Sequence, residues 1–239
     1  MLKDPKQIKE TRAYTLLVCV YVTLVVVLIA TAGRLSFFNV PFMGQVYYGA
    51  PYYIVPGIFF IENVLAEVYG YERSRRAVQL SILCSFIYGA YLLFTVLLPS
   101  PPQFSKITQE FNDVFRTFPR HYLAFVAAWY SGSILNEVLL VKFKIMMQGR
   151  HFILRALTSV FFGELLYQII GSLVSRLGTL SLLEIAKYDT FSFVSKLGFE
   201  ILLAPFILVL CRYLKRLEQL DVYDYSTKFN PLKLTIDHA

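Results

Sequence analysis

Long runs of hydrophobic residues make up most of the chain, and short clusters of charged residues separate them. Six of these runs are long enough to cross a hydrocarbon core of about 30 Å as helices. These six runs cover approximately residues 14–32, 51–68, 77–98, 122–141, 157–177 and 191–214. The pattern predicts an all-α membrane protein with six transmembrane helices, a number that two three-helix halves would also give.

The composition supports this interpretation. The 239 residues are 56% hydrophobic and 16% charged, with a mean hydropathy of +0.55, whereas roughly a quarter of the residues in soluble domains are charged. The hydrophobic runs leave no room for a soluble domain. We therefore expect a single six-helix transmembrane domain over residues 1–239, with short tails at about 1–13 and 215–239.

Basic residues lie mainly on one side of the predicted helices. Sixteen of the 23 Lys and Arg residues fall in the two tails and in the turns after the second and fourth runs. Because such residues are enriched on the cytoplasmic side, both termini are expected in the cytoplasm. The longest connection, residues 99–120, is then expected outside, with a short interfacial helix in FSKITQEFNDVF. The net charge of +7 reflects this topology, so no nucleic-acid partner is expected.

Ionisable and amide side chains interrupt four of the hydrophobic runs. A charged side chain at the bilayer centre costs roughly 2.5–3.5 kcal/mol, so such groups are expected to face protein, water or a ligand. Residues four apart share a helix face, and several of these groups have that spacing. Together they could converge on one substrate site between the helices. The candidate binding residues are Glu62, Asn63, Glu67, Asn136, Glu137, Glu164, Gln168, Lys196 and Glu200.

Structural roles are the alternatives for some of these candidates. Glu67 could be an interfacial cap partner for the Arg-rich turn that follows it, and Glu137 could pair with Lys142 or Lys144. A structural ion pair is the alternative for two further candidates, Lys196 and Glu200. By contrast, Glu62 and Glu164 lie deepest in their runs with no basic residue near in sequence, and function is the default for such acids.

The sequence gives little support for an enzyme. His121, His151 and His238 lie at run ends or in the tail, and no His or Cys cluster has the spacing of a metal site. No nucleophile motif or nucleotide-binding motif is present. We therefore expect no catalytic site, no metal and no cofactor.

Three stretches of the chain carry a family resemblance. IVPGIFFIENVLAEVYGYERSRRAV, residues 54–78, combines a proline-containing apolar entry, an acidic mid-helix, EVYG and an Arg-rich turn. LTSVFFGELLYQIIGSL and KLGFEILLAPFILVL follow at residues 157–173 and 196–210. In this order they resemble the second, fifth and sixth spans of the queuosine precursor transporter family, also called the vitamin uptake transporter family.

The resemblance implies import of queuosine precursors, either 7-deazaguanine bases or queuine, across the inner membrane for tRNA modification. A carboxylate can accept the adjacent N–H donors of such a purine-like base, and aromatic rings can stack on its faces. The alternative is an uptake or substrate-binding subunit for another small vitamin-like molecule, which would need an energising partner. Besides the bilayer and the substrate, a homo-oligomer is a possible partner.

The chain also departs from the family pattern. Many members carry Asp where this chain has Asn63, Asn136 and Tyr167. Here the acids are neighbouring residues, Glu62, Glu137 and Glu164. A shift of one residue turns a helical side chain by about 100°, so either the cavity is rearranged or the substrate differs.

Overall fold

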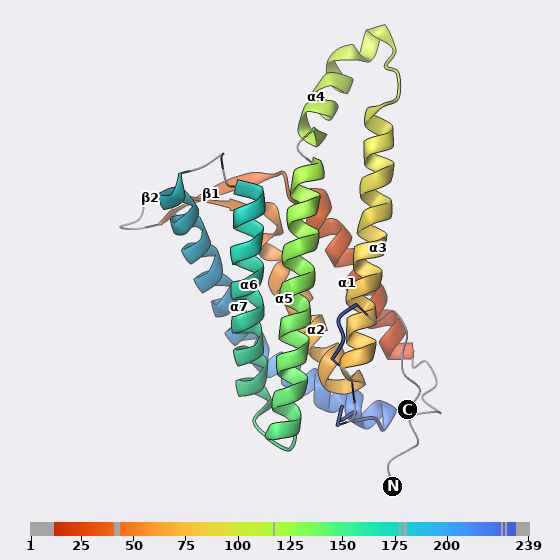
Figure 1. The fold of residues 1–239 in the computed structure, drawn as a ribbon, viewed down its shortest axis with the longest axis vertical. Coiled ribbons are helices and arrows are strands. Elements are labelled where there is room, and N and C mark those ends of the chain that lie inside the picture. The colour runs from red at the N-terminus through yellow and green to blue at the C-terminus, as the bar shows by residue number, and fades with distance from the viewer. Residues whose placement is uncertain are drawn as a thin grey trace.

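The computed structural model describes residues 12–40, 44–116, 118–176, 178, 181–225, 227 and 229–232. Six helices form a bundle: α1 (Arg12–Thr31), α2 (Val55–Tyr69), α3 (Tyr71–Val96), α5 (Phe118–Met146), α6 (Phe152–Arg176) and α7 (Leu182–Glu218). Consecutive bundle helices run in opposite directions, so the start of α1 and the end of α7 lie at the same end of the bundle (Figure 1). We call this the inner end, because the basic turns gather there, and the opposite one the outer end.

Each of the six predicted runs corresponds to a bundle helix. Five of the helices, α1, α3, α5, α6 and α7, are long and apolar enough to cross a membrane. The exception is α2, which has 15 residues and therefore spans only about 22 Å. Thirteen of those residues are buried, so α2 is an internal helix enclosed by the others. A short 3₁₀ turn, Ala50–Tyr53, accounts for the rest of the second predicted run.

The first outer connection differs from the sequence prediction, which gave a loop. Strands β1 (Leu35–Val40) and β2 (Gly44–Gly49) pair there as an antiparallel hairpin. Figure 1 shows it across the outer end of the bundle, near the start of α7, and the backbone N–H of Gly49 donates to the Tyr188 hydroxyl. From the sequence, Gly33, Asn39, Pro41 and Gly44 suggested a loop, but the aromatic residues of this segment favour a strand pair.

The second outer connection confirms the prediction of a short helix. Helix α4 (Ser105–Phe115) follows the 3₁₀ turn Pro102–Phe104 and lies beyond the outer end of α5, beside the protruding end of α3 (Figure 1). Its apolar side chains Ile107, Phe111 and Val114 are exposed. Their spacing of three and four residues places them on one face, as expected for a helix at a membrane surface.

At the inner end, a single residue joins α2 to α3. Gly70 has φ 83°, a conformation that favours glycine, and a Cβ there would lie 2.7 Å from Cγ1 of Val222. The predicted Arg-rich turn is therefore not a turn: Arg73, Arg75 and Arg76 lie in the first two turns of α3.

The described part of the C-terminal tail packs against the inner end of the bundle. The helix α7 continues to Glu218, beyond the predicted boundary at 215, and the chain then turns at Gln219. Asp224 Oδ2 accepts a hydrogen bond from the backbone N–H of Tyr71, the first residue of α3, at 3.1 Å. Further along, Arg75 and Gln79 donate to the backbone carbonyls of residues 230 and 231. The predicted N-terminal tail lies almost wholly outside the described residues.

Candidate functional site

The predicted polar residues are arranged in three places along the bundle. Helix α2 gives their order, because Val55 at its outer end lines a cavity, Glu62 and Asn63 lie mid-helix, and Glu67 lies near its inner end. We call these places the outer cavity, the middle polar cluster and the inner ion-pair network. The sequence suggested that the nine candidates could converge on one cavity. In the structure they are instead spread along the length of the bundle.

The inner ion-pair network consists of Glu67, Lys144, Arg155, Lys215 and Asp221. Arg155 donates to both carboxylate oxygens of Glu67, at 2.9 and 3.2 Å, and Lys215 Nζ donates to Oε1 at 2.6 Å. Lys144 Nζ donates to the backbone carbonyl of Glu67 at 2.7 Å and to Asp221 at 2.6 Å. Cations from α5, α6 and α7 thus meet on one acid of α2, which is 2% exposed.

Asp221 ties the C-terminal tail into this network. Burial would raise the pKa of Asp221, but the ammonium groups of Lys144 and Lys215 lower it below its usual value. The carboxylate is therefore charged at neutral pH and holds the start of the tail against the bundle. The alternative role for Glu67, as partner of a basic cluster, agrees with this geometry, although its partners come from α5, α6 and α7 rather than from the Arg residues after α2.

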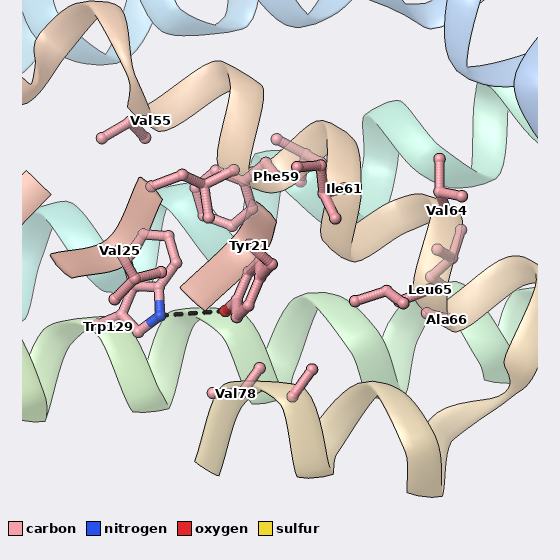
Figure 2. Close-up of a cluster of buried hydrophobic side chains, with 14 of the residues drawn as sticks. Tyr21, Val25, Val55, Phe59, Ile61, Val64, Leu65, Ala66, Val78 and Trp129 are labelled. Carbon is pink, nitrogen blue, oxygen red and sulfur yellow. Dashed lines mark hydrogen bonds between the residues drawn. The ribbon is translucent and has the colours of Figure 1, made fainter. Parts of the chain in front are cut away.

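The middle polar cluster lies among α1, α2, α3 and α5 and is fully buried. Its residues are Tyr21, Glu62, Asn63, Ser74, Ser133, Asn136 and Glu137. The Tyr21 hydroxyl donates to Oε1 of Glu62 at 2.6 Å, and Ser74 donates to Oε1 of Glu137 at 2.5 Å. Figure 2 shows the indole nitrogen of Trp129 donating to the Tyr21 oxygen, over 3.3 Å, within the surrounding hydrophobic packing.

Two positions where many members of the resembled family carry Asp meet in this cluster. Nδ2 of Asn136 donates to Oδ1 of Asn63 at 3.2 Å, between α5 and α2. The neighbouring acids Glu62 and Glu137 are buried in the same region rather than turned to the outside. The suggested pairing of Glu137 with Lys142 or Lys144 is wrong: Glu137 accepts from Ser74, while Lys144 pairs with Glu67 and Asp221.

The outer cavity has a volume of about 130 Å³. Its walls come from the outer ends of α1, α5, α6 and α7, from the hairpin end and from the start of α2; among the lining residues are Tyr52, Tyr167, Gln168, Arg176, Tyr188 and Lys196. Ligand pockets for drug-sized molecules are typically about 300–1,000 Å³, so this cavity suits a compact ligand. Aromatic rings, an amide and cationic groups line it together.

An ion pair between α6 and α7 adjoins this cavity, and its Lys196 is one of the lining residues. Lys196 Nζ lies 2.5 Å from Oε1 of Glu164 and 3.3 Å from Oε1 of Gln168, and it also lies 4.9 Å from the ring centre of Tyr167. The predicted pair of Lys196 with Glu200 is therefore wrong, since Lys196 pairs across helices with Glu164. Glu200 is buried on α7, and its Oε1 has no hydrogen-bond partner.

Several residues of these places were missed from the sequence. Asp189 accepts hydrogen bonds from Gln168 and Ser172, both at 2.6 Å, and forms an ion pair with Arg176 at 3.1 Å. It precedes the sixth predicted run by two residues and was taken as part of a connection. Tyr21 was missed because a tyrosine within a hydrophobic run looks like a packing residue. Arg155 and Lys215, which hold Glu67, were counted only for topology.

Comparison with known proteins agrees with this architecture. A family model described as "Putative vitamin uptake transporter" matches residues 50–210, from the start of the 3₁₀ turn before α2 to the inner half of α7. No curated protein and no solved structure matches the chain. The matched region covers about two thirds of the chain and includes the middle polar cluster apart from Tyr21 and most of the residues that line the outer cavity. The chain is a multi-pass membrane protein that belongs to the vitamin uptake transporter family.

Proposed function

We propose that this protein imports queuosine precursors, as free 7-deazaguanine bases or queuine, across the inner membrane. The observation that carries the proposal is the difference between the two ends of the bundle. A polar, aromatic-lined cavity lies at the outer end, whereas at the inner end ion pairs tie α2 to α5, α6 and α7 beside a second cavity of about 790 Å³. Buried polar groups connect the two. We propose that the outer cavity is accessible from outside and that the ion pairs hold the inner end closed, as one of the two states of an alternating-access carrier.

The chemistry of the outer cavity suits a flat heterocycle with several hydrogen-bonding edges. Gln168 offers an amide in the cavity wall, and behind that wall Glu164, the ion-pair partner of the lining residue Lys196, has a carboxylate oxygen, Oε2, that is buried without a partner. Tyr52 and Tyr167 present aromatic surface in the cavity wall. We propose that the base first contacts Glu164, Gln168 and Lys196. It would then pass the middle polar cluster, where Glu62, Asn63, Asn136 and Glu137 lie, and leave past Glu67.

Release to the inside requires the inner ion-pair network to separate. Glu67 belongs to α2, whereas its partners belong to α5, α6 and α7, so a relative movement of these helices would break the contacts. We therefore assign Glu67 to closure of the inner end. Glu200, on α7 between the network and the outer cavity, is proposed as a further polar group on the path.

Uptake in cells tests the proposal. Cells that cannot synthesise queuosine precursors should regain queuosine in tRNA, and accumulate a labelled 7-deazaguanine base, when they produce this protein. Lys196→Met should abolish uptake, whereas Lys187→Met, the same change at an exposed position of α7, should leave it intact. Uptake into liposomes containing only the purified protein would distinguish a complete carrier from a subunit that needs an energising partner. Absence of uptake in both systems would refute the proposal.

A further inference from the structure

The middle polar cluster contains more hydrogen-bonding capacity than its residues use. Five of its side-chain atoms are buried without a hydrogen-bond partner: Glu62 Oε2, Asn63 Nδ2, Ser133 Oγ, Asn136 Oδ1 and Glu137 Oε2. All five residues have an exposed fraction of 0%. Buried polar groups in folded proteins are almost always satisfied, and exceptions call for a specific explanation. Five in one place mark a site where the chain alone is incomplete.

The two carboxyl groups of the cluster also have no ion-pair partner. In the described part of the chain, four of the cations inside the bundle pair with other acids: Lys144, Arg155 and the half-buried Lys215 with Glu67, and Lys196 with Glu164. Glu62 accepts the Tyr21 hydroxyl on Oε1, and the polar groups of Ser133 and Asn136 lie close enough to its carboxyl group to interact with it. Glu137 accepts the Ser74 hydroxyl on Oε1. An ionised carboxylate accepts at about four lone-pair positions, and burying one with so few donors and no cation is very unfavourable.

A protonated carboxyl group fits these surroundings better. A neutral Glu needs fewer donors, because it keeps one acceptor oxygen and gains an O–H that can donate. The unpartnered oxygens of Ser133 and Asn136 are acceptors of this kind in the same cluster. Transmembrane carriers use such buried acids as proton sites, because intramembrane acids change their charge when their surroundings open to water.

The other titratable and charged groups around the two carboxyl groups do not remove the cost of burying them as ionised carboxylates. Tyr21 on α1 donates a hydrogen bond to Glu62, and Tyr71 on α3 and Tyr130 on α5 bring hydroxyl groups rather than cations. Glu200 on α7 acts on Glu62 as a third acid, not as a counter-ion. On α3, Arg75 acts electrostatically on Glu137, but it donates to the carbonyl of Asn230 and packs on the Tyr71 ring.

We propose that Glu62 and Glu137 are the proton-binding groups of this protein and that base import is coupled to proton movement through them. The protons are bound in the state described here, with the inner end closed, and are released when that end opens to the cytoplasm. The coupling part of the proposal rests on the proposed function, whereas the protonation of the two side chains does not.

Infrared spectroscopy of the purified protein tests protonation without any substrate. At neutral pH the wild-type protein should show the carbonyl band of protonated carboxylic acids. The band should lose intensity in Glu62→Gln and again in Glu137→Gln, since an amide keeps the size of the side chain but carries no carboxyl proton. Glu110→Gln, the same change in the exposed helix α4, should leave the band unchanged. A band that neither buried substitution alters would overturn the proposal.

Proton flux tests coupling. Liposomes with an internal pH dye and a labelled 7-deazaguanine base should show protons and base moving together in the wild-type protein. The number of protons moved per base should fall by more than half in Glu137→Gln. Base movement without protons in the wild-type protein, or uptake driven by sodium instead, would overturn the coupling. No base movement at all would refute the proposed function, while the infrared result would still decide the protonation.

Discussion

Arg155 of α6 holds Glu67 of α2 by two parallel hydrogen bonds, of 2.9 and 3.2 Å, at a point where both side chains are almost completely buried. A guanidinium group matches a carboxylate in this two-point geometry, which makes the contact directional as well as strong. Lys215 adds a contact at 2.6 Å from α7. The internal helix α2 is thereby fixed to both of these long helices at the inner end.

We expect Glu67→Gln to destabilise the closed inner end strongly. The substitution leaves the cations of Arg155, Lys144 and Lys215 close together without their shared acid, and breaking a buried ion pair costs about 3–5 kcal/mol. The thermal midpoint in detergent should fall clearly. Glu110→Gln, on the exposed face of α4, is the control and should not change it. A midpoint equal to that of the wild-type protein would mean that the network contributes nothing to closure.

The crossing of α5 and α6 depends on two glycines in contact. A Cβ on Gly163 would lie 2.8 Å from Cβ of Asn136 and 2.8 Å from the carbonyl oxygen of Gly132. We expect Gly163→Ala to cost about 1–3 kcal/mol, because overpacking forces the helices apart. Gly171→Ala is the matched control on the same helix, since its Cβ would meet only Ala128, at 3.5 Å. Equal thermal midpoints for the two variants in detergent would contradict this view of the crossing.

The sequence predicted the bundle well because the signal for a membrane helix is simple. Long apolar runs identified every bundle helix, and the basic residues identified the end at which the turns meet. Its failures have specific causes. The two strands of the outer hairpin have only six residues each and several aromatic side chains. A hydropathy pattern does not distinguish such strands from a loop at the membrane interface. The burial of α2 depends on the packing of five other helices, which no local pattern contains.

The site was predicted less completely than the fold. Their positions within hydrophobic runs indicated that Glu62, Asn63, Asn136 and Glu137 are polar side chains inside the membrane region. The structure buries all four. Helical spacing, however, describes one helix at a time, so it suggested a pair of Lys196 with Glu200, four residues away. The structure pairs Lys196 with Glu164, which is 32 residues away and on another helix. Contacts between helices depend on their relative rotation, which the sequence alone does not specify.

The C-terminal tail should contribute to stability through Asp224. Its carboxylate accepts from the backbone N–H of Tyr71 at 3.1 Å and from the Thr227 hydroxyl at 2.7 Å, so it serves as a cap for α3. Removing a capping acceptor costs about 0.5–2 kcal/mol. We expect Asp224→Ala to lower the thermal midpoint in detergent and Asp224→Asn, which keeps an acceptor oxygen, to lower it less. If the two substitutions have the same effect, the hydrogen bond to Tyr71 is not the cause.

Cysteine labelling should confirm the orientation of the bundle. In a variant without Cys19, Cys84 and Cys211, a cysteine at the exposed position Ser105 of α4 should react with a membrane-impermeant reagent added outside. One at Arg150, exposed in the turn between α5 and α6, should react only after the membrane is permeabilised. The opposite result would reverse the assignment of inner and outer ends.

The ion pair of Lys196 with Glu164 allows a test that separates stability from transport. Losing one member of a buried pair leaves an uncompensated charge, whereas replacing both by neutral groups removes that cost. Lys196→Met should therefore destabilise the protein in detergent. Addition of Glu164→Gln should restore most of the lost stability, because Glu164 is the group left unpaired. Addition of Glu200→Gln instead should restore less, because Glu200 is not the partner of Lys196.

Uptake should not recover together with stability. In the proposed function Lys196 and Glu164 contact the base in the outer cavity, and the neutral pair Lys196→Met with Glu164→Gln lacks both the cation and the carboxylate. We therefore expect this double variant to regain most of the wild-type stability and still to fail in the uptake of a labelled 7-deazaguanine base. Uptake that returned along with stability would show that the pair only supports the packing of α6 against α7. The contacts of the base would then have to be sought in the middle polar cluster.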